Sequence, residues 1–549
     1  MRALLSGAVA AFLLCSPVRT EAVQSSPPRL VVVISLDQFP FEYTTRFARS
    51  FGTGGFLRLA RQGASFVNAT YKHAVNLTGP GHAVILSGAY GNQNGIITNN
   101  WYDRETAGTV YCVEDKSATI VGASGKGRSP ANFIGATYGD QLRLHTGFRA
   151  KVISVSHKDR AAILLGGKLA SGVYWQSDSL FVTSSYYAPV LPAWVNAFNA
   201  SGLVNSYFGR QWTQTLPESA FATTDVDDAP YENPDPGLSR SFPHPITGSD
   251  SGRITSSYYS ALTTSPFGSE VLAAFARAAV RGERLGARGV TDLLCVSFSS
   301  TDYVGHDFGP QSREVMEMAV AIDGVIARFL DFLDAEVGKG RYLVALTSDH
   351  GVSPTPEYIL AQYPHADAGR VSPDSIAARC EGTLTARFGP PPAGRKWIAR
   401  SVDRNIYFDP ATLAAAGTTA EAAAQTVVPA LSALRGVAAA FTRAQLMEGS
   451  SPSVLLQKAV RSFHPLRSGD LFFVMKPFYF EGRGSRGTTH GEPYDYSAHV
   501  PLLLSGPGVA HGTFAVEASP ADLGPTLSAL TGVEFPAGRE GRVLIEALR

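Results

Sequence analysis

The sequence predicts an α/β fold with a central, mostly parallel sheet and helices on both faces, to which cap segments are added. Three continuous apolar runs indicate the strands: residues 29–38 (RLVVVISLDQ), 292–307 (DLLCVSFSSTDYVGHD) and 341–351 (RYLVALTSDHG). Runs of Val, Ile and Leu without alternation are typical of parallel strands buried on both faces. Helical patterns at 270–286 and 315–338 lie between the runs. This alternation predicts an open sheet that binds its ligands at the carboxyl ends of the strands.

The composition excludes several classes of protein. Lys and Arg number 47 against 46 Asp and Glu, which gives a formal net charge of +1. A balanced charge provides no overall field for nucleic acid or for an anionic membrane, so neither is an expected partner. Hydrophobic residues make up 44% of the 549 residues. That is the composition of an ordinary globular protein with a large core.

Residues 1–22 have the pattern of a secretory signal peptide. Arg2 is followed by an apolar run from Ala3 to Leu14, and then by small and polar residues. The run is too short to cross a bilayer as a helix. We therefore expect a periplasmic or secreted protein that has no membrane span and whose mature chain begins near Val23.

Changes in composition divide the rest of the chain into core and inserted segments. Two segments interrupt the strand–helix alternation. One is rich in Ser, Tyr, Pro and aromatic residues, and the other contains an Ala-rich helical pattern. The expected order is a first core segment at 28–165, an insertion or cap at 166–260, a second core segment at 261–355, a small α+β cap at 356–485 and a C-terminal core segment at 486–549.

Carboxylate and imidazole side chains gather where the predicted strands end. They are Asp37, Asp302, His306, Asp349, His350 and, in a later loop, His490. Carboxylate oxygens and neutral imidazole nitrogens are ligands that zinc prefers, and six of them suffice for two ions. The pattern therefore predicts two zinc ions per chain.

The segment NLTGPGHAVILSG offers a nucleophile in Thr78. The glycines and proline that follow predict a turn at the start of a helix, where backbone N–H groups attract an anion. A neighbouring metal lowers the pKa of such a hydroxyl and activates it. The alternative is that Thr78 caps the helix. Asn99 is a candidate donor to a developing oxyanion, with Asn100 as the competing choice.

Several blocks of the sequence together resemble the alkaline phosphatase superfamily across nearly the whole mature chain. They are SLDQFPFEY, NLTGPGHAVILSGAYGNQNGI, STDYVGHDFGP, SDHGV and THGEPYDYSAHVPLLLSGPGV, in this order. The resemblance implies that one zinc is bound by Asp302, His306 and His490. It implies that the other is bound by Asp37, Asp349, His350 and the nucleophile Thr78.

Within the superfamily, the sequence is most similar to the phosphate-insensitive periplasmic alkaline phosphatases of bacteria, which use a threonine nucleophile. Their Lys-x-Arg motif is matched by Lys158 and Arg160. Nucleotide pyrophosphatase/phosphodiesterases share the metal blocks, the threonine and Asn99, but lack this motif. In an extended chain residues i and i+2 point the same way, so we expect both cations to face the site.

The resemblance and the residues together predict an alkaline phosphatase, a phosphoric monoester hydrolase that works through phosphorylated Thr78. Asn99, Lys158 and Arg160 are expected to bind the oxygens of the phosphoryl group, which carries about two negative charges in a monoester. Small-molecule phosphate monoesters are the expected substrates. The alternative is a phosphodiesterase or nucleotide pyrophosphatase of the same superfamily; a catalytically inactive binding protein on this fold is a further alternative.

Overall fold

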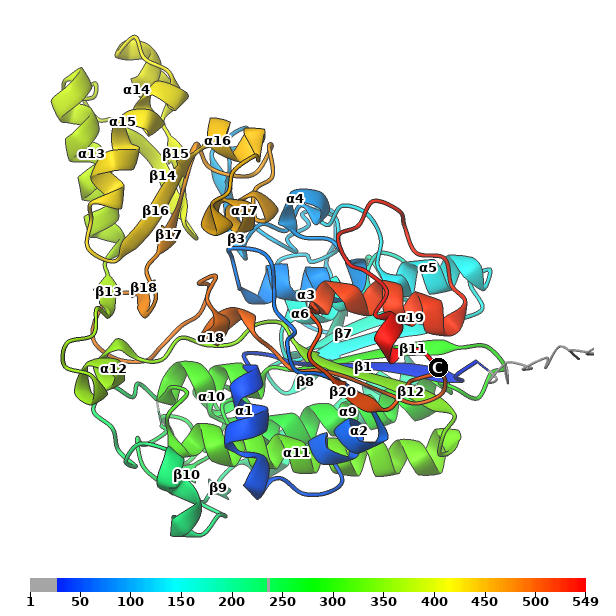
Figure 1. The fold of residues 1–549 in the computed structure, drawn as a ribbon. Coiled ribbons are helices and arrows are strands. Elements are labelled where there is room, and N and C mark those ends of the chain that lie inside the picture. Colours follow the sequence, from blue (N-terminus) through cyan, green and yellow to red (C-terminus); the bar gives the residue numbers. More distant parts are fainter. Residues whose placement is uncertain (1–26, 235–236) are drawn as a thin grey trace, which may run out of the picture.

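A ten-stranded sheet forms the centre of the protein (Figure 1). The computed structural model describes residues 27–234 and 237–549, so the predicted signal peptide at 1–22 lies outside the described residues. Across the sheet the strands follow the order β20 (Gly512–Phe514), β2 (Gly63–Phe66), β19 (Leu502–Ser505), β12 (Tyr342–Ser348), β1 (Leu30–Leu36), β11 (Asp292–Phe298), β6 (Val152–Ser156), β7 (Gly172–Ser177), β8 (Leu180–Ser184) and β5 (Ile120–Val121).

The middle of the sheet is parallel, and its strands are the apolar runs of the sequence. Strand β1 pairs in parallel with β11 on one side and β12 on the other, from Leu30 to Leu36 without a shift in register. Strands β6 and β7 continue the parallel order, whereas β19, β2 and β8 pair antiparallel to a neighbour. All residues of β1, β11 and β12 are buried. The predicted α/β class is therefore confirmed.

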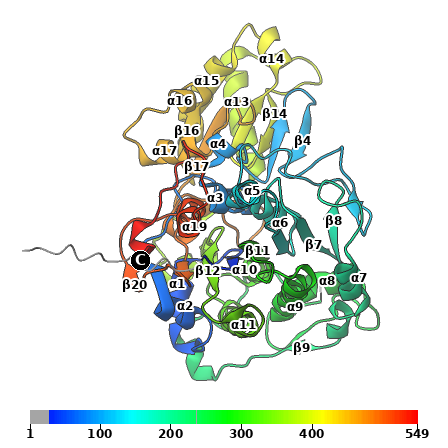
Figure 2. The ribbon, with the colours of Figure 1, turned by 90° about the vertical axis from the view of Figure 1, so that its right-hand side faces the viewer.

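Helices cover both faces of the sheet, as Figure 2 shows. Val32 and Ile34 of β1 pack with residues of α9 (Pro266–Glu283) and α11 (Arg313–Leu333) on one face. Val31 and Val33, which point the other way, pack on the opposite face with the helices α3 (Thr78–Ser87), α5 (Tyr138–His145) and α19 (Leu523–Thr531). Because alternate residues of one strand enter two cores, a continuous apolar run is required.

The expected boundary at residue 166 does not coincide with the edge of the core. Strands β7 and β8, which follow it, both belong to the central sheet. They are short and mix Ser, Thr, Gln and aromatic residues with apolar ones, which hides the strand pattern in the sequence. The expected insertion at 166–260 therefore begins inside the sheet.

Residues 373–475 form a second sheet with its own core, which we call the small domain. Its four antiparallel strands follow the order β14 (Ile398–Val402), β15 (Asn405–Phe408), β17 (Leu471–Met475) and β16 (Val437–Thr442). Helices α13 (Pro373–Phe388) and α15 (Ala420–Ser432) share its core around the fully buried Trp397. In Figure 1 the small domain projects from the central sheet on the side of α3 and α4 (Gly91–Asn94).

Shorter elements complete the structure. They are α1 (Phe41–Arg46), α2 (Phe56–Gln62), β3 (Asn100–Asp103), β4 (Gly108–Tyr111), α6 (Asp159–Gly166), α7 (Ala193–Ala200), β9 (Gln211–Trp212), β10 (His244–Pro245), α8 (Ser256–Thr263), α10 (Ser300–Phe308), α12 (Pro356–Gln362), β13 (Gly369–Val371), α14 (Pro410–Ala415), α16 (Arg443–Glu448), α17 (Val454–Arg461), β18 (Tyr479–Glu481) and α18 (Asp495–Ala498). Among the described residues, no helix combines the length and the apolar composition that crossing a membrane requires.

Replacing Ile34 with alanine should test the central strand. Ile34 is fully buried, so the change should lower the free energy of unfolding by about 2–5 kcal/mol through lost burial and an unfilled cavity. Urea unfolding measures this loss. Leu466→Ala is the control, since Leu466 is 85% exposed. Equal stabilities of the two variants would contradict the assignment of β1 to the core.

Candidate metal centre

The parallel strands bring the predicted ligands to one edge of the sheet. Asp37 directly follows β1, Asp349 and His350 directly follow β12, and Asp302 lies in the first turn of α10, just after β11. Because these three strands are parallel neighbours in register, their carboxyl ends coincide. His490 comes from the segment that follows the small domain.

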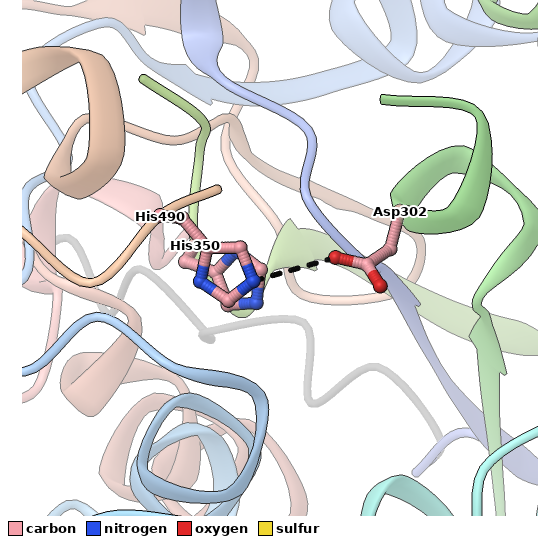
Figure 3. A group of neighbouring side chains, drawn as sticks. All are labelled: Asp302, His350 and His490. Carbon is pink, nitrogen blue, oxygen red and sulfur yellow. Dashed lines mark ion pairs between the residues drawn. The ribbon is translucent and has the colours of Figure 1, made fainter. Parts of the chain in front are cut away.

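A first group of ligands consists of Asp302, His350 and His490, whose ligand atoms all lie within 4.8 Å of one another. Figure 3 shows the two imidazoles side by side with the Asp302 carboxylate facing them. The rings of His350 and His490 are stacked with centroids 3.6 Å apart. Nε2 of His490 lies 3.5 Å and Nε2 of His306 3.3 Å from the same Asp302 oxygen, so His306 joins this group.

A second group consists of Asp37, Asp349 and His350, again within 4.8 Å. Nε2 of His350 lies 3.5 Å from Asp37 Oδ1 and 3.3 Å from Asp349 Oδ2. The Thr78 hydroxyl lies 3.4 Å from the same nitrogen. Both expected ligand sets are therefore brought together, and His350 lies between them.

The histidines are oriented by backbone carbonyl groups. The Nδ1 atoms of His306, His350 and His490 lie 2.8, 2.9 and 2.8 Å from the carbonyl oxygens of Thr488, Gly351 and Asn76. A carbonyl oxygen can only accept, so each Nδ1 carries a proton, and the lone pair of the neutral ring is then on Nε2. The Nε2 atoms face the carboxylates, which is the usual arrangement of metal-binding histidines.

The charges of the centre also fit a cation. Burial raises the pKa of Asp349, with the neighbouring Asp37 carboxylate acting in the same direction, to about 7. Burial lowers the pKa of His350 well below its ordinary value, and the nearby His490 adds to this, so its imidazole is neutral. Among the described residues, Asp37 Oδ1 accepts no hydrogen bond. A buried carboxylate oxygen without a donor, beside imidazole nitrogens, belongs to a donor set suited to zinc.

Lys158 lies between the two ligand groups. Its ammonium nitrogen lies 2.7 Å from an oxygen of Asp37 and 2.5 Å from an oxygen of Asp302, and it stacks over the Tyr303 ring at 4.9 Å. Burial by itself would lower the pKa of Lys158, but the carboxylates of Asp302 and Asp37 outweigh it and raise that pKa. The lysine is therefore a charged group at the centre.

Arg160 reaches the centre by a different geometry from the one expected. Lys158 is the extended N-cap residue of α6, and Arg160 is already inside that helix, so the extended-chain argument was wrong. The helix begins at the centre, and its first turn brings the guanidinium inward. Nη2 of Arg160 lies 3.3 Å from the Thr78 hydroxyl, and Nη1 lies 3.4 Å from that of Tyr111.

The turn around Thr78 places its hydroxyl towards the centre. The N-cap residue of α3 is Leu77, so Thr78 is not the capping residue. Asn99 lies beside this turn, where its Oδ1 accepts a 2.7 Å hydrogen bond from the backbone N–H of Gly79. Its amide NH2 remains as a donor. Asn100 is instead the first residue of β3, which leaves Asn99 as the residue beside Thr78.

His82 belongs to the centre but was not identified from the sequence. It is fully buried on α3, with Nδ1 2.9 Å from the Thr78 carbonyl oxygen and 3.1 Å from Asp349 Oδ2. Nε2 lies 2.8 Å from the hydroxyl of Ser297. His82 therefore links the nucleophile turn to a ligand carboxylate. Its spacing of four residues from Thr78, one helical turn, was the available signal.

Gln38 is a second such residue. Its side-chain amide donates to Asp302 Oδ1 at 2.8 Å, and its backbone N–H donates to Asp349 Oδ1 at 3.1 Å. It thereby orients one carboxylate from each ligand group. Only its position directly after Asp37 marked it in the sequence.

Comparisons with known proteins agree with this architecture. The family model described as type I phosphodiesterase / nucleotide pyrophosphatase matches residues 31–406. The alkaline phosphatase PhoV of Synechococcus elongatus is 35% identical over 535 residues, which cover 95% of this chain and 93% of PhoV. The alkaline phosphatase PafA of Elizabethkingia meningoseptica is 32% identical over 536 residues, which cover 96% of both chains. The crystal structure of wild-type PafA matches with a TM-score of 0.89 and 31% identity, covering 95% of this chain and 99% of that one.

The fold is that of the alkaline phosphatase superfamily, and two clusters of potential metal ligands lie at the edge of its central sheet. Within it, the chain belongs to the type I phosphodiesterase / nucleotide pyrophosphatase family and is a phosphatase enzyme. The expected membership of the superfamily is thereby confirmed.

Replacing Gly81 with alanine should disturb the centre without replacing any of the proposed ligand residues. A Cβ atom at Gly81 would lie 2.2 Å from the backbone oxygen of Asp349, so α3 and Asp349 would have to move apart. We expect a loss of bound metal and at least about a tenfold loss of activity, by analogy with other changes next to metal ligands. Elemental analysis and rate measurements test this.

Gly382→Ala is the matched control, because Gly382 also lies within a helix but has open space at its Cβ position. It should keep its metal and its activity. A Gly81→Ala variant that retained metal and rate as the control does would show that the contact between α3 and Asp349 is not needed.

Proposed function

We propose that this protein is an exported, zinc-dependent alkaline phosphatase that hydrolyses small phosphate monoesters through a phosphothreonine at Thr78. One observation carries the proposal. The Thr78 hydroxyl lies 3.4 Å from Nε2 of His350, in the second ligand group, and 3.3 Å from the Arg160 guanidinium. A hydroxyl between potential metal ligands and a fixed cation is placed to attack an anionic phosphoryl group.

The chain's own side chains position the phosphoryl group of the substrate. Asn99, Lys158 and Arg160 offer an amide, an ammonium and a guanidinium around Thr78, and they are proposed to bind the non-bridging oxygens of the phosphoryl group. Arg binds two oxygens at once, whereas Lys acts as a point charge. A pair of zinc ions, when bound, supplies Lewis-acid chemistry that lowers the pKa of the nucleophile and offsets charge on the leaving oxygen.

The reaction proceeds in two displacements. Thr78 loses its proton to solvent and attacks phosphorus, the P–O bond to the alcohol breaks, and the alcohol leaves with a proton from solvent. Water then attacks the phosphothreonine, which releases phosphate and restores the hydroxyl. In both displacements Asn99, Lys158 and Arg160 face the charge of the transferred group, so catalysis is mainly positioning and electrostatics.

The two cations favour a monoester over a diester. A monoester phosphoryl group carries about two negative charges and exposes three non-bridging oxygens, whereas a diester has one charge and a second substituent to accommodate. The charged groups of the buried Lys158 and the half-buried Arg160 therefore stabilise the monoester more. The relatives PhoV and PafA are named alkaline phosphatases, which supports the same choice, while the matched family model keeps the phosphodiesterase alternative in view.

Removal of metal should abolish the activity. Asp37, Asp302, His306, Asp349, His350 and His490 form the proposed ligands of two zinc ions. Dialysis against a chelator should therefore leave less than about a hundredth of the rate, and zinc should restore it. Calcium, which prefers oxygen ligands, should not restore it. Elemental analysis that finds less than one zinc per active chain would refute the proposed cofactor.

Replacing Lys158 and Arg160 together with alanine should damage monoester hydrolysis selectively. Each lost charge-assisted hydrogen bond is worth about 1.5–3 kcal/mol, so the pair should cost on the order of a thousandfold in rate on a monoester. Diester turnover should change little. Metal content should be retained, because neither residue is a ligand and the loss of a cation beside Asp37 and Asp302 does not oppose metal binding.

The control removes the same net charge from the surface. Arg61 and Lys339 are both exposed, and their double alanine variant should leave both rates unchanged. Should the Lys158 and Arg160 variant lose monoesterase and diesterase activity in equal proportion while keeping its metal, the two cations would not select monoesters, and the phosphodiesterase alternative would gain.

A further inference from the structure

The small domain reaches the metal centre through the turn between β14 and β15. Asp403 and Arg404 form this turn, and both have positive φ angles, of 44° and 70°. Tight hairpins with two such residues usually carry Asn, Asp or Gly there, so Asp403 suits its position, whereas Arg404 is strained in the left-handed region. Arg404 is therefore held in a conformation that it does not favour, by contacts beyond the hairpin.

Arg404 makes the first of these contacts, on the side of the metal ligand His490. Its Nη2 lies 2.6 Å from Glu492 Oε1, and its Nη1 donates to the carbonyl oxygen of Gly491 at 3.3 Å. Its Nε lies 3.2 Å from Glu481 Oε2. Arg404 is 7% exposed and Glu492 is fully buried, so this is an enclosed ion pair whose hydrogen bonds depend on the planar guanidinium.

The segment that Arg404 binds directly follows His490 and fixes its ring. Asn76 donates its side-chain amide to the Glu492 carbonyl at 2.7 Å, and its own carbonyl accepts from His490 Nδ1 at 2.8 Å. A cavity of about 120 Å³ adjoins His490 and Arg404. Since packing is incomplete on that side, hydrogen bonds hold the segment in place. Arg404 therefore acts on the imidazole through Gly491 and Glu492.

Asp403 makes the second contact, on the side of the substrate residue Asn99. Its Oδ2 lies 3.4 Å from the backbone N–H of Asn100. The preceding residue, Asn99, accepts the hydrogen bond from the Gly79 backbone at 2.7 Å, next to Thr78. Asp403 thus restrains the segment that aims the Asn99 amide.

We propose that Asp403 and Arg404 are positioning residues through which the small domain sets the geometry of the centre. Arg404 holds His490 for metal retention, and Asp403 holds Asn99 for phosphoryl binding. The roles of His490 and Asn99 rest on the proposed function. If the hairpin only attached the small domain to the core, changing Asp403 or Arg404 would not affect His490 or Asn99.

The Arg404 contact is tested by metal retention, which does not depend on the substrate. Arg404→Lys keeps the charge but loses the planar fork, and it should weaken zinc retention against a competing chelator by about tenfold to a hundredfold. Arg395→Lys is the matched control, because Arg395 pairs with Asp409 inside the small domain, 3.2 Å apart. It should retain zinc like the unmodified protein.

The Asp403 contact is tested by a double-mutant cycle. Asp403→Gly removes the carboxylate while glycine accepts the positive φ. It should lower kcat/KM on a monoester about fivefold, which is the effect of one hydrogen bond, but leave kcat/KM unchanged when Asn99 is already alanine. Asp403→Asn keeps an acceptor oxygen and should retain most of the activity.

The outcomes separate this proposal from the proposed function. If Arg404→Lys retains zinc like Arg395→Lys, or if Asp403→Gly and Asn99→Ala have additive effects, the positioning roles are refuted. If the unmodified protein binds zinc but does not hydrolyse monoesters, the proposed function fails. The chelator competition then still decides the role of Arg404, because it measures metal and not turnover.

Discussion

The structure depends on one electrostatic constraint: three buried carboxylates and three imidazoles meet at the edge of a sheet. Carboxylate oxygens of Asp37 and Asp349 lie within 4.8 Å of each other, and Asp302 lies in the other group that contains His350. Such a concentration of buried negative charge is costly unless a cation is near. Three features compensate this charge. Backbone carbonyls accept the Nδ1 hydrogen bonds of the histidines, Gln38 donates to two of the carboxylates, and the ammonium of Lys158 pairs with Asp37 and Asp302.

Two helix N-termini add positive charge to the centre, beside Lys158. Thr78 is the first residue of α3, and α6 begins at Asp159, directly after Lys158. The N-terminal end of a helix carries a partial positive charge and exposed N–H groups, which favour an anion. Thr78, the proposed nucleophile, and the two cations therefore lie where the backbone itself attracts an anion. A chain with a formal charge of only +1 thus places two cations and two helix N-termini beside the carboxylates of the centre.

Most of the fold and the members of the centre were predictable, because the signals are local. The apolar runs ending at Asp37 and Asp349 mark parallel strands, and such strands share one carboxyl edge. The direction of Arg160 was predicted for the wrong reason, because an extended chain was assumed where α6 had already begun. Gln38 and His82 were missed because their roles depend on partners more than 200 residues away in the chain. The edge of the core at β7 and β8 was missed because two short mixed strands lack a periodic pattern.

The span of the ligands along the chain, from Asp37 to His490, has a consequence for assembly. The first ligand belongs to the first strand, while the last follows the small domain, so nearly the whole chain must be in place before the donor set exists. Contacts this distant in sequence form slowly, because loop closure costs entropy before any contact compensates it. Topology therefore favours an order in which the polypeptide folds first, with Lys158 paired to Asp37 and Asp302, and a cation binds the assembled residues afterwards.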